Sequence, residues 1–216
     1  NTITYDDKYD EHSFRVLVGQ EAMLDKWDLL GAYSPGVDPA IPYPTTGKGE
    51  TDQVDFNIVE ESLLSFFGVA DYNYDNRYFF QASVRGDGSS LFGSQAKWGA
   101  FWSVSGSWNI ANEKFMSSTR SWLSGLKIRA SYGVNGNNNI EAYRAYGVYG
   151  AINYAGATGM VPSRPENPNL AWERNKTWDL GLDFSFFDDR LTGSGDIYYR
   201  KTSDMLLSKR VPYTTG

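Results

Sequence analysis

Hydrophobic and polar residues alternate along much of this chain with a period of two. In the clearest segment the apolar set is Trp98, Ala100, Trp102, Val104, Gly106, Trp108 and Ile110. The residues between them are mostly Gly, Ser and Asn. Because successive side chains of a β-strand point to opposite faces, this pattern predicts a strand with one apolar face and one polar face.

The same alternation recurs in further segments and predicts an all-β chain of antiparallel strands. These segments are 12–18, 64–74, 78–84, 126–132, 177–186 and 191–199. The sequence therefore predicts about seven strands, most of them near the ~9–11 residues that a tilted membrane-spanning strand requires.

The connections between these strands alternate in length. Short turn-like links occur at Asp75-Asn76 and Asp188-Asp189, and residues 111–124 have a pattern typical of one short helix. The alternate connections are long and rich in Gly, Pro, Tyr and Asn, and they cover 21–61, 86–96 and 133–176. Up-and-down strands with short links at one end and long loops at the other are typical of transmembrane β-barrels, whose short turns face the periplasm. We therefore expect an antiparallel up-and-down barrel wall with its long loops outside the cell.

A soluble β-sandwich would show the same alternation, so the two faces have to distinguish the folds. On the apolar face, which carries Trp98, Trp102, Trp108 and Trp178, aromatic residues cluster towards strand ends and small residues lie mid-strand, as in the aromatic girdles of a membrane barrel. We expect these four tryptophans to contact lipid. Asp179 and Asp183 fall on the opposite face, where we expect a wet lumen.

Composition excludes several functional classes. The net charge is −6, with no basic run, so nucleic acid is not expected as a partner. The chain has no Cys and a single His, His12, which excludes a disulfide scaffold and leaves almost no basis for a catalytic triad or a His-ligated metal. The sequence predicts no catalytic residue, no metal site, no cofactor and no enzymatic activity.

The chain contains no apolar run near the ~18 residues of a membrane helix. It also begins at Asn1 rather than Met. We expect it to be a piece of a longer protein.

Five runs of residues carry a resemblance to one family. In order and spacing they are similar to motifs of the SusC/RagA-type TonB-linked outer-membrane proteins of Bacteroidetes. The runs are Phe67–Tyr78, Ala82–Gly93, Trp98–Trp108, Leu126–Ile140 and Pro168–Tyr199. The resemblance covers about residues 62–216, and several ordered motifs are more specific than any one alone.

The resemblance implies a large barrel whose lumen is filled by a plug domain. It implies TonB-driven import of oligosaccharides or peptides across the outer membrane, with a SusD-like surface lipoprotein over the outer loops. Residues 1–216 would all belong to the barrel, and the plug and its TonB-contacting segment would lie elsewhere. Two other functions stay open at this stage: a passive porin or structural barrel, and a soluble glycan-binding β-sandwich.

Aromatic residues of the longest loop are the candidates for contact with cargo. They are Tyr143, Tyr146, Tyr149, Tyr154 and Trp172. Exposed rings can stack on the faces of sugars or peptides, so these residues form a predicted substrate-binding set. The alternative is that they pack the loop onto itself or against the lipoprotein.

Overall fold

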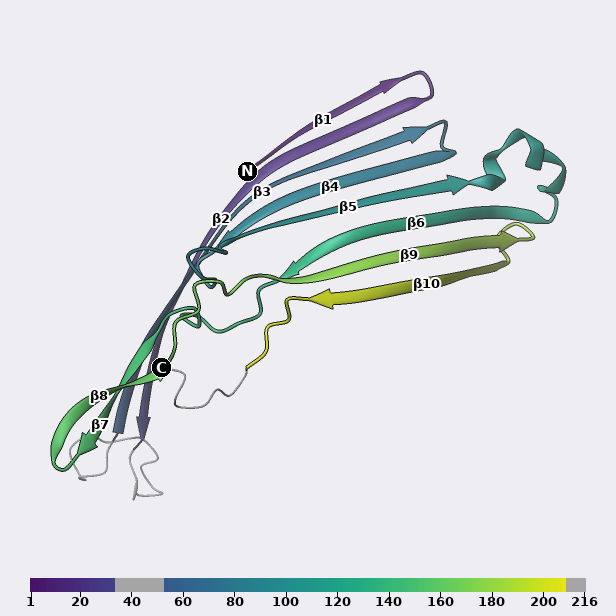
Figure 1. Ribbon diagram of the computed structural model, residues 1–216. Coiled ribbons are helices and arrows are strands. Elements are labelled where there is room, and N and C mark those ends of the chain that lie inside the picture. The colour runs from purple at the N-terminus through teal and green to yellow at the C-terminus, as the bar shows by residue number, and fades with distance from the viewer. Residues whose placement is uncertain (34–52, 209–216) are drawn as a thin grey trace, which may run out of the picture.

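Eight strands lie side by side in one antiparallel sheet in the computed structural model, which describes residues 1–33 and 53–208 (Figure 1). In spatial order they are β1 (Thr2–Tyr9), β2 (His12–Tyr33), β3 (Gln53–Tyr74), β4 (Tyr78–Ser89), β5 (Trp98–Asn109), β6 (Leu123–Asn137), β9 (Glu173–Phe186) and β10 (Leu191–Ser203). A separate hairpin, β7 (Val148–Tyr154) and β8 (Ala157–Arg164), lies within the β6–β9 connection. The predicted antiparallel up-and-down β fold is confirmed.

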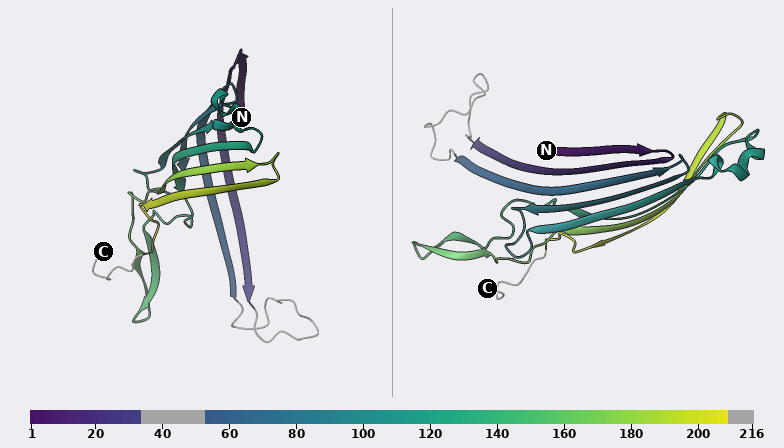
Figure 2. Two further views of the ribbon diagram at one scale, coloured as in Figure 1. Left: turned by 90° about the vertical axis from the view of Figure 1, so that its right-hand side faces the viewer. Right: turned by 90° about the horizontal axis from the view of Figure 1, so that it is seen from above.

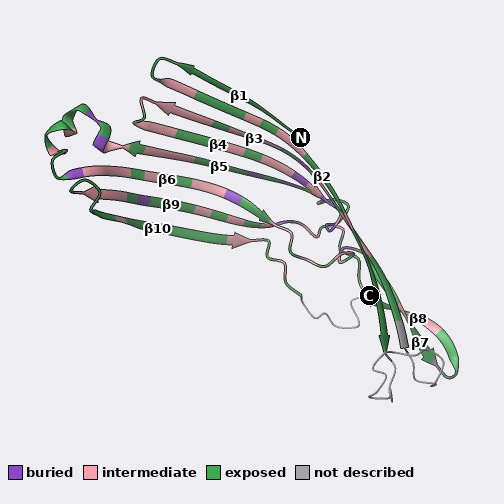
Figure 3. Cartoon of the chain, turned by 180° about the vertical axis from the view of Figure 1, so that it is seen from behind, coloured by how far each residue is buried: buried purple, intermediate pink, exposed green. Residues whose placement is uncertain are grey.

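The sheet is a single curved layer (Figure 2). Among the described residues, no second sheet packs on either face, and buried residues occupy only small parts of the chain (Figure 3). A β-sandwich would cover its apolar face with another sheet. The single layer therefore argues against the soluble sandwich.

The short links lie at one end of the strands, together with the longer β5–β6 connection, and the β2–β3, β4–β5 and β6–β9 connections lie at the opposite end, as predicted (Figure 1). Asp75 and Asn76 have φ of 50° and 52°, and Asp188 and Asp189 have φ of 54° and 62°. Asp and Asn tolerate this left-handed backbone better than most residues, which explains why the sheet reverses at these positions.

The predicted helix over 111–124 is instead two short 3₁₀ helices, η1 (Ile110–Asn112) and η2 (Lys114–Thr119). Glu113 between them is extended, with φ −71° and ψ 147°, and this interrupts the helical hydrogen bonding. In the part of the chain that the structure describes, no helix is both long enough and apolar enough to cross a membrane.

The strands extend further than the alternation of residues predicts. Residues 21–33 and 53–61, expected in a loop, continue β2 and β3, and 34–52 lie outside the described residues. The other two predicted loops are also shorter, because β4 continues to Ser89 and β6 to Asn137. In these extensions the backbone ladder continues although the apolar alternation has ended.

The sheet also has one strand more than the sequence predicts. β1 pairs with β2 from Thr2–Gly19 to Tyr9–His12. The alternation of apolar and polar residues does not predict β1, because Asp7 lies on the apolar face, opposite Phe14.

Candidate functional site

The four tryptophans expected at lipid share one face of the sheet. Trp102 lies opposite Val84 and Val134, and Trp178 lies opposite Tyr132 and Tyr199. All four remain partly exposed, from 37% for Trp108 to 57% for Trp98. Apolar side chains at this exposure are costly in water and favourable in hydrocarbon.

The distance between the two ends of β5 matches the thickness of a membrane. Trp98 and Trp108 are ten residues apart, which is roughly 33 Å along a strand at ~3.3 Å per residue. A tilt of ~40° reduces this to roughly 25 Å, the height of the apolar band of an outer-membrane barrel. The two rings are therefore spaced as two interfacial girdles would be.

Aromatic rings continue across neighbouring strands at the end with the short links. The ring of Tyr78 stacks on Trp108 at 6.2 Å and on Tyr74 at 6.2 Å, and His12 lies 4.9 Å from Tyr74. His12 also shares a hydrogen bond of 2.9 Å with the hydroxyl of Tyr72. The lone histidine is thus part of an aromatic band on the apolar face.

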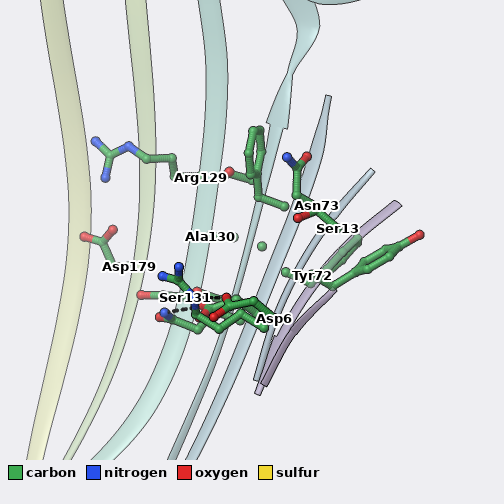
Figure 4. Close-up of a pocket in the computed structure, with 16 residues that line it drawn as sticks. Asp6, Ser13, Tyr72, Asn73, Arg129, Ala130, Ser131 and Asp179 are labelled. Atoms are coloured by element: carbon green, nitrogen blue, oxygen red, sulfur yellow. Dashed lines mark hydrogen bonds and ion pairs between the residues drawn. The ribbon is translucent and has the colours of Figure 1, made fainter. Parts of the chain in front are cut away.

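The opposite face is polar and carries ion pairs between neighbouring strands. Arg129 on β6 donates to both carboxylate oxygens of Asp183 on β9, at 2.8 and 2.9 Å, and to Asp196 on β10 at 2.9 Å. Asp179 and Asp183 lie on this face, as predicted. Side chains from β1, β2, β3, β4, β5, β6 and β9 surround a shallow hollow here, which includes Asp6, Arg129 and Asp179 (Figure 4).

A second charged group joins β2, β3 and β4 nearer the long connections. Arg85 donates to Asp87 at 2.6 Å, Glu21 at 2.7 Å and the hydroxyl of Ser65 at 2.8 Å. Ser65 and Asp87 are buried. Because its guanidinium is already shared among three acceptors, Arg85 serves to hold these strands together.

Trp172 lies in a small buried cluster beneath the outer connections. It is 6% exposed, and it packs with Leu91, Phe92 and Phe101. Its ring centroid lies 4.8 Å from that of Phe92, and its Nε1–H donates to the carbonyl of Lys97 at 3.0 Å. This differs from the exposed position expected for a residue that stacks on cargo, since the faces of the indole are already covered.

The loop tyrosines lie at the surface. Tyr143, Tyr146 and Tyr149 are 42%, 52% and 65% exposed. The hydroxyl of Tyr143 accepts a hydrogen bond of 2.9 Å from the backbone N–H of Glu60. The side chain of Tyr154 lies outside the described residues. Of the predicted set, Tyr146 and Tyr149 keep the most ring surface free for a partner.

Sequence reasoning misses Glu113, which forms a buried hub at the end with the short links. Its carboxylate accepts hydrogen bonds from the Tyr78 hydroxyl at 2.6 Å, Trp108 Nε1 at 3.0 Å and Arg77 Nη1 at 3.0 Å. These bonds hold the pKa of the Glu113 carboxyl below its ordinary value, with Tyr78 the largest cause and Trp108 the next. A single Glu in a polar connection gives no pattern that would reveal this role.

The chain is similar to known proteins over its whole length. The family model described as TonB dependent receptor-like, beta-barrel matches residues 1–216. The TonB-dependent receptor SusC of Bacteroides thetaiotaomicron is 41% identical over 163 residues, which are 72% of this chain and 16% of that protein. The TonB-dependent receptor P3 of Formosa agariphila is 33% identical over 222 residues, which are 100% of this chain and 22% of that protein. The chain thus spans about a sixth to a fifth of the length of these curated relatives.

The chain is also similar to solved structures. A structure entitled "Structure of the RagAB peptide transporter" superposes with a TM-score of 0.85 at 32% identity, covering 99% of this chain and 24% of that chain. A second, of the RagAB peptide importer in the open-open state, has a TM-score of 0.84 at the same identity and coverage. At this identity and score, the likeness covers both fold and sequence.

Proposed function

Because the chain belongs to the family of TonB dependent receptor-like β-barrels, we propose that it forms part of the wall of an outer-membrane transporter of the SusC/RagA type. The observation that carries the proposal is the unopposed apolar face, whose aromatic rings are spaced to match the apolar band of a barrel. All of residues 1–216 belong to the barrel domain in this proposal. The plug and the segment that contacts TonB lie in other parts of the protein.

The short links face the periplasm and the long connections face the outside. Asp75-Asn76 and Asp188-Asp189 belong to the first end, and the β7–β8 hairpin belongs to the second. The polar face with Arg129 and Asp183 then lines the lumen. This arrangement agrees with the turn and loop lengths of outer-membrane barrels.

The transported material is a large nutrient, an oligosaccharide or a peptide, and a SusD-like surface lipoprotein covers the outer loops. The similar structures are entitled as a RagAB peptide transporter, which supports a peptide as cargo. An oligosaccharide is the other class of cargo that the resemblance to SusC/RagA-type proteins implies. Tyr146 and Tyr149 are the loop residues with most ring surface for the cargo or the lipoprotein. Trp172 supports the same loops from beneath.

A matched pair of arginine substitutions tests the wall. Val104 lies on the apolar face of β5 and its neighbour Ser105 on the polar face. In the full-length protein, Val104→Arg should cost about 2–4 kcal/mol, as expected for Arg on a lipid face near the bilayer centre. Ser105→Arg should be tolerated, because Ser105 lines the polar hollow, in which the carboxylates of Asp6, Asp71 and Asp179 outnumber the guanidinium groups of Arg15 and Arg129.

The measurement is the amount of folded barrel in the outer membrane, read from heat-modifiable migration on gels, together with the urea midpoint in vesicles. Equal loss for both variants, or greater loss for Ser105→Arg, would reject the assignment of the two faces.

Uptake of labelled oligosaccharides and peptides by cells with and without TonB tests active import. We expect uptake to require TonB. Uptake that continues at the same rate without TonB would identify a passive porin. The double variant Tyr146→Ala/Tyr149→Ala should lower uptake or binding of the lipoprotein while the barrel remains folded, and unchanged uptake and binding would exclude these tyrosines.

A further inference from the structure

The connection between β5 and β6, residues 110–122, is joined to the end of the apolar face. It contains η1 and η2 and projects beyond the ends of the strands (Figure 1). The buried carboxylate of Glu113 fastens it there through Tyr78 and Trp108, whose rings belong to the apolar face. The connection is therefore attached to the aromatic band of the apolar face and not to the polar face.

This connection carries large exposed rings. Phe115 on η2 is 65% exposed and Trp122 is 46% exposed. Trp122 stacks on Phe186 of β9 with centroids 5.9 Å apart and planes 9° apart. Its carbonyl accepts a hydrogen bond of 2.9 Å from the N–H of Phe187, a ring that is 56% exposed. Two neighbouring links thus join into one aromatic patch.

The missing remainder of a barrel would not cover this patch by adding strands. β5 and β6 lie inside the sheet, flanked by β4 and β9, and further strands could join only at β1 and β10. The length of the connection is also unnecessary for reversing the chain. β3 and β4 are joined by Asp75–Arg77 alone.

The basic residues of the connection are suited to a phospholipid surface. Lys114 and Arg120 are exposed on either side of Phe115. In an amphipathic interfacial segment, aromatic rings enter the boundary between headgroups and acyl chains while basic residues meet the phosphates. A phospholipid leaflet presents phosphates and the start of the acyl chains next to each other at the membrane surface.

We propose that residues 110–122 are an interfacial anchor that lies in the periplasmic leaflet of the outer membrane. Phe115 and Trp122 enter the acyl boundary, and Lys114 and Arg120 pair with phospholipid phosphates. Glu113 is the positioning residue that fastens the anchor to the wall. The proposal rests on the proposed function, since it takes the apolar face to be in lipid.

Depth measurement with nitroxide labels tests the anchor in the full-length transporter, reconstituted in vesicles of phosphatidylethanolamine and phosphatidylglycerol. This chain has no cysteine, so an introduced thiol is unique within it. Three variants are compared: Phe115→Cys in the anchor, Val104→Cys on the apolar band and Asn76→Cys in the short β3–β4 link. The readout is the collision rate with oxygen, which concentrates in the bilayer, relative to a water-soluble nickel chelate.

We expect the ratio for Phe115→Cys to lie between the two controls and severalfold above that of Asn76→Cys. If Phe115→Cys matches Asn76→Cys while Val104→Cys reports lipid, the anchor is wrong and the wall stands. A label at Val104→Cys in water would refute the wall itself. If the label at Phe115→Cys is shielded from both reagents, a protein covers the patch and the lipid proposal is refuted.

Replacing the two basic residues tests the phosphate contact separately. The label for this test is placed at Ser118→Cys, another exposed residue of the connection. The double variant Lys114→Gln/Arg120→Gln keeps the rings and should lower the ratio of oxygen to nickel collisions at this label. The reduction should be larger in vesicles that contain phosphatidylglycerol than in vesicles of phosphatidylethanolamine alone, because an anionic surface attracts basic residues. An identical ratio in the presence and absence of the charges would refute the phosphate contact.

Discussion

Replacing Trp172 by alanine removes the largest side chain of the cluster beneath the outer connections. The indole packs on Phe92 and Phe101, and its N–H is bound to the carbonyl of Lys97. These partners come from the β4–β5 connection and β5, whereas Trp172 comes from the segment just before β9. One substitution therefore loosens segments that are far apart in the sequence.

The expected cost follows from the burial. A buried Trp→Ala change costs about 3–5 kcal/mol, and a hydrogen bond contributes about 1 kcal/mol of net stability. Since ~1.4 kcal/mol is a factor of ten, local opening should rise roughly 100- to 5,000-fold. Trp172→Phe keeps a ring but loses the N–H, and at about 1 kcal/mol its local opening should rise only about fivefold.

Limited proteolysis of the full-length transporter, with the cleavage sites read by mass spectrometry, measures this opening. Cleavage should concentrate within 90–97 and 138–172 while the strands stay protected, because cleavage follows the population of the open form. Tyr149→Ala is the control, since that ring is 65% exposed and its loss opens no cavity. If Trp172→Ala is cut no faster than Tyr149→Ala, the cluster does not hold the outer connections and the reasoning fails.

Two further predictions concern the ends of the wall. The lowered pKa of Glu113 means that its stabilisation is complete above its ordinary value of 4.5 and is lost as the pH falls through the folded value. The melting temperature of the native protein should therefore fall more steeply on acidification than that of Glu113→Gln, and parallel curves would contradict the hub. At the other end, a Cβ on Gly93 would clash with the backbone carbonyl of Pro168, so Gly93→Ala should cost about 1–3 kcal/mol, measured by proteolysis of the outer connections. A Cβ on Gly86 meets nothing within 4 Å, so Gly86→Ala should stay within ~0.5 kcal/mol, and equal effects would count against this packing.

The faces of the wall could be predicted from the sequence because a strand in a membrane barrel has two different environments. Trp102 and Ser103 occupy opposite faces as their alternation requires. The outer halves of β2 and β3 could not be predicted in the same way. Beyond the apolar band both faces are expected to meet water, so neighbours such as Leu29 and Leu30 are both apolar and exposed, and backbone pairing alone continues the strands to Tyr33 and Gln53.

The loop aromatics show the second limit of sequence reasoning. Trp172 and Tyr149 are both aromatic residues in a long connection, yet one is buried and the other exposed. Which of them is buried depends on which connections meet in space, and Phe92 and Phe101 lie far away in the sequence. Local patterning does not contain that information.

The strand ends and the faces between them are stabilised by different interactions. A single curved layer has no continuous core, and its buried apolar residues, such as Phe92, Trp172 and Leu123, lie mostly near the strand ends and in the connections. In the proposed wall, the faces between the ends gain their stability from the bilayer on one side and from ion pairs on the other. Substitutions on the apolar face should therefore impair insertion of the whole barrel. Substitutions in the end clusters should open connections while the inserted barrel remains, and this separation gives Val104→Arg and Trp172→Ala opposite outcomes in the gel and proteolysis assays.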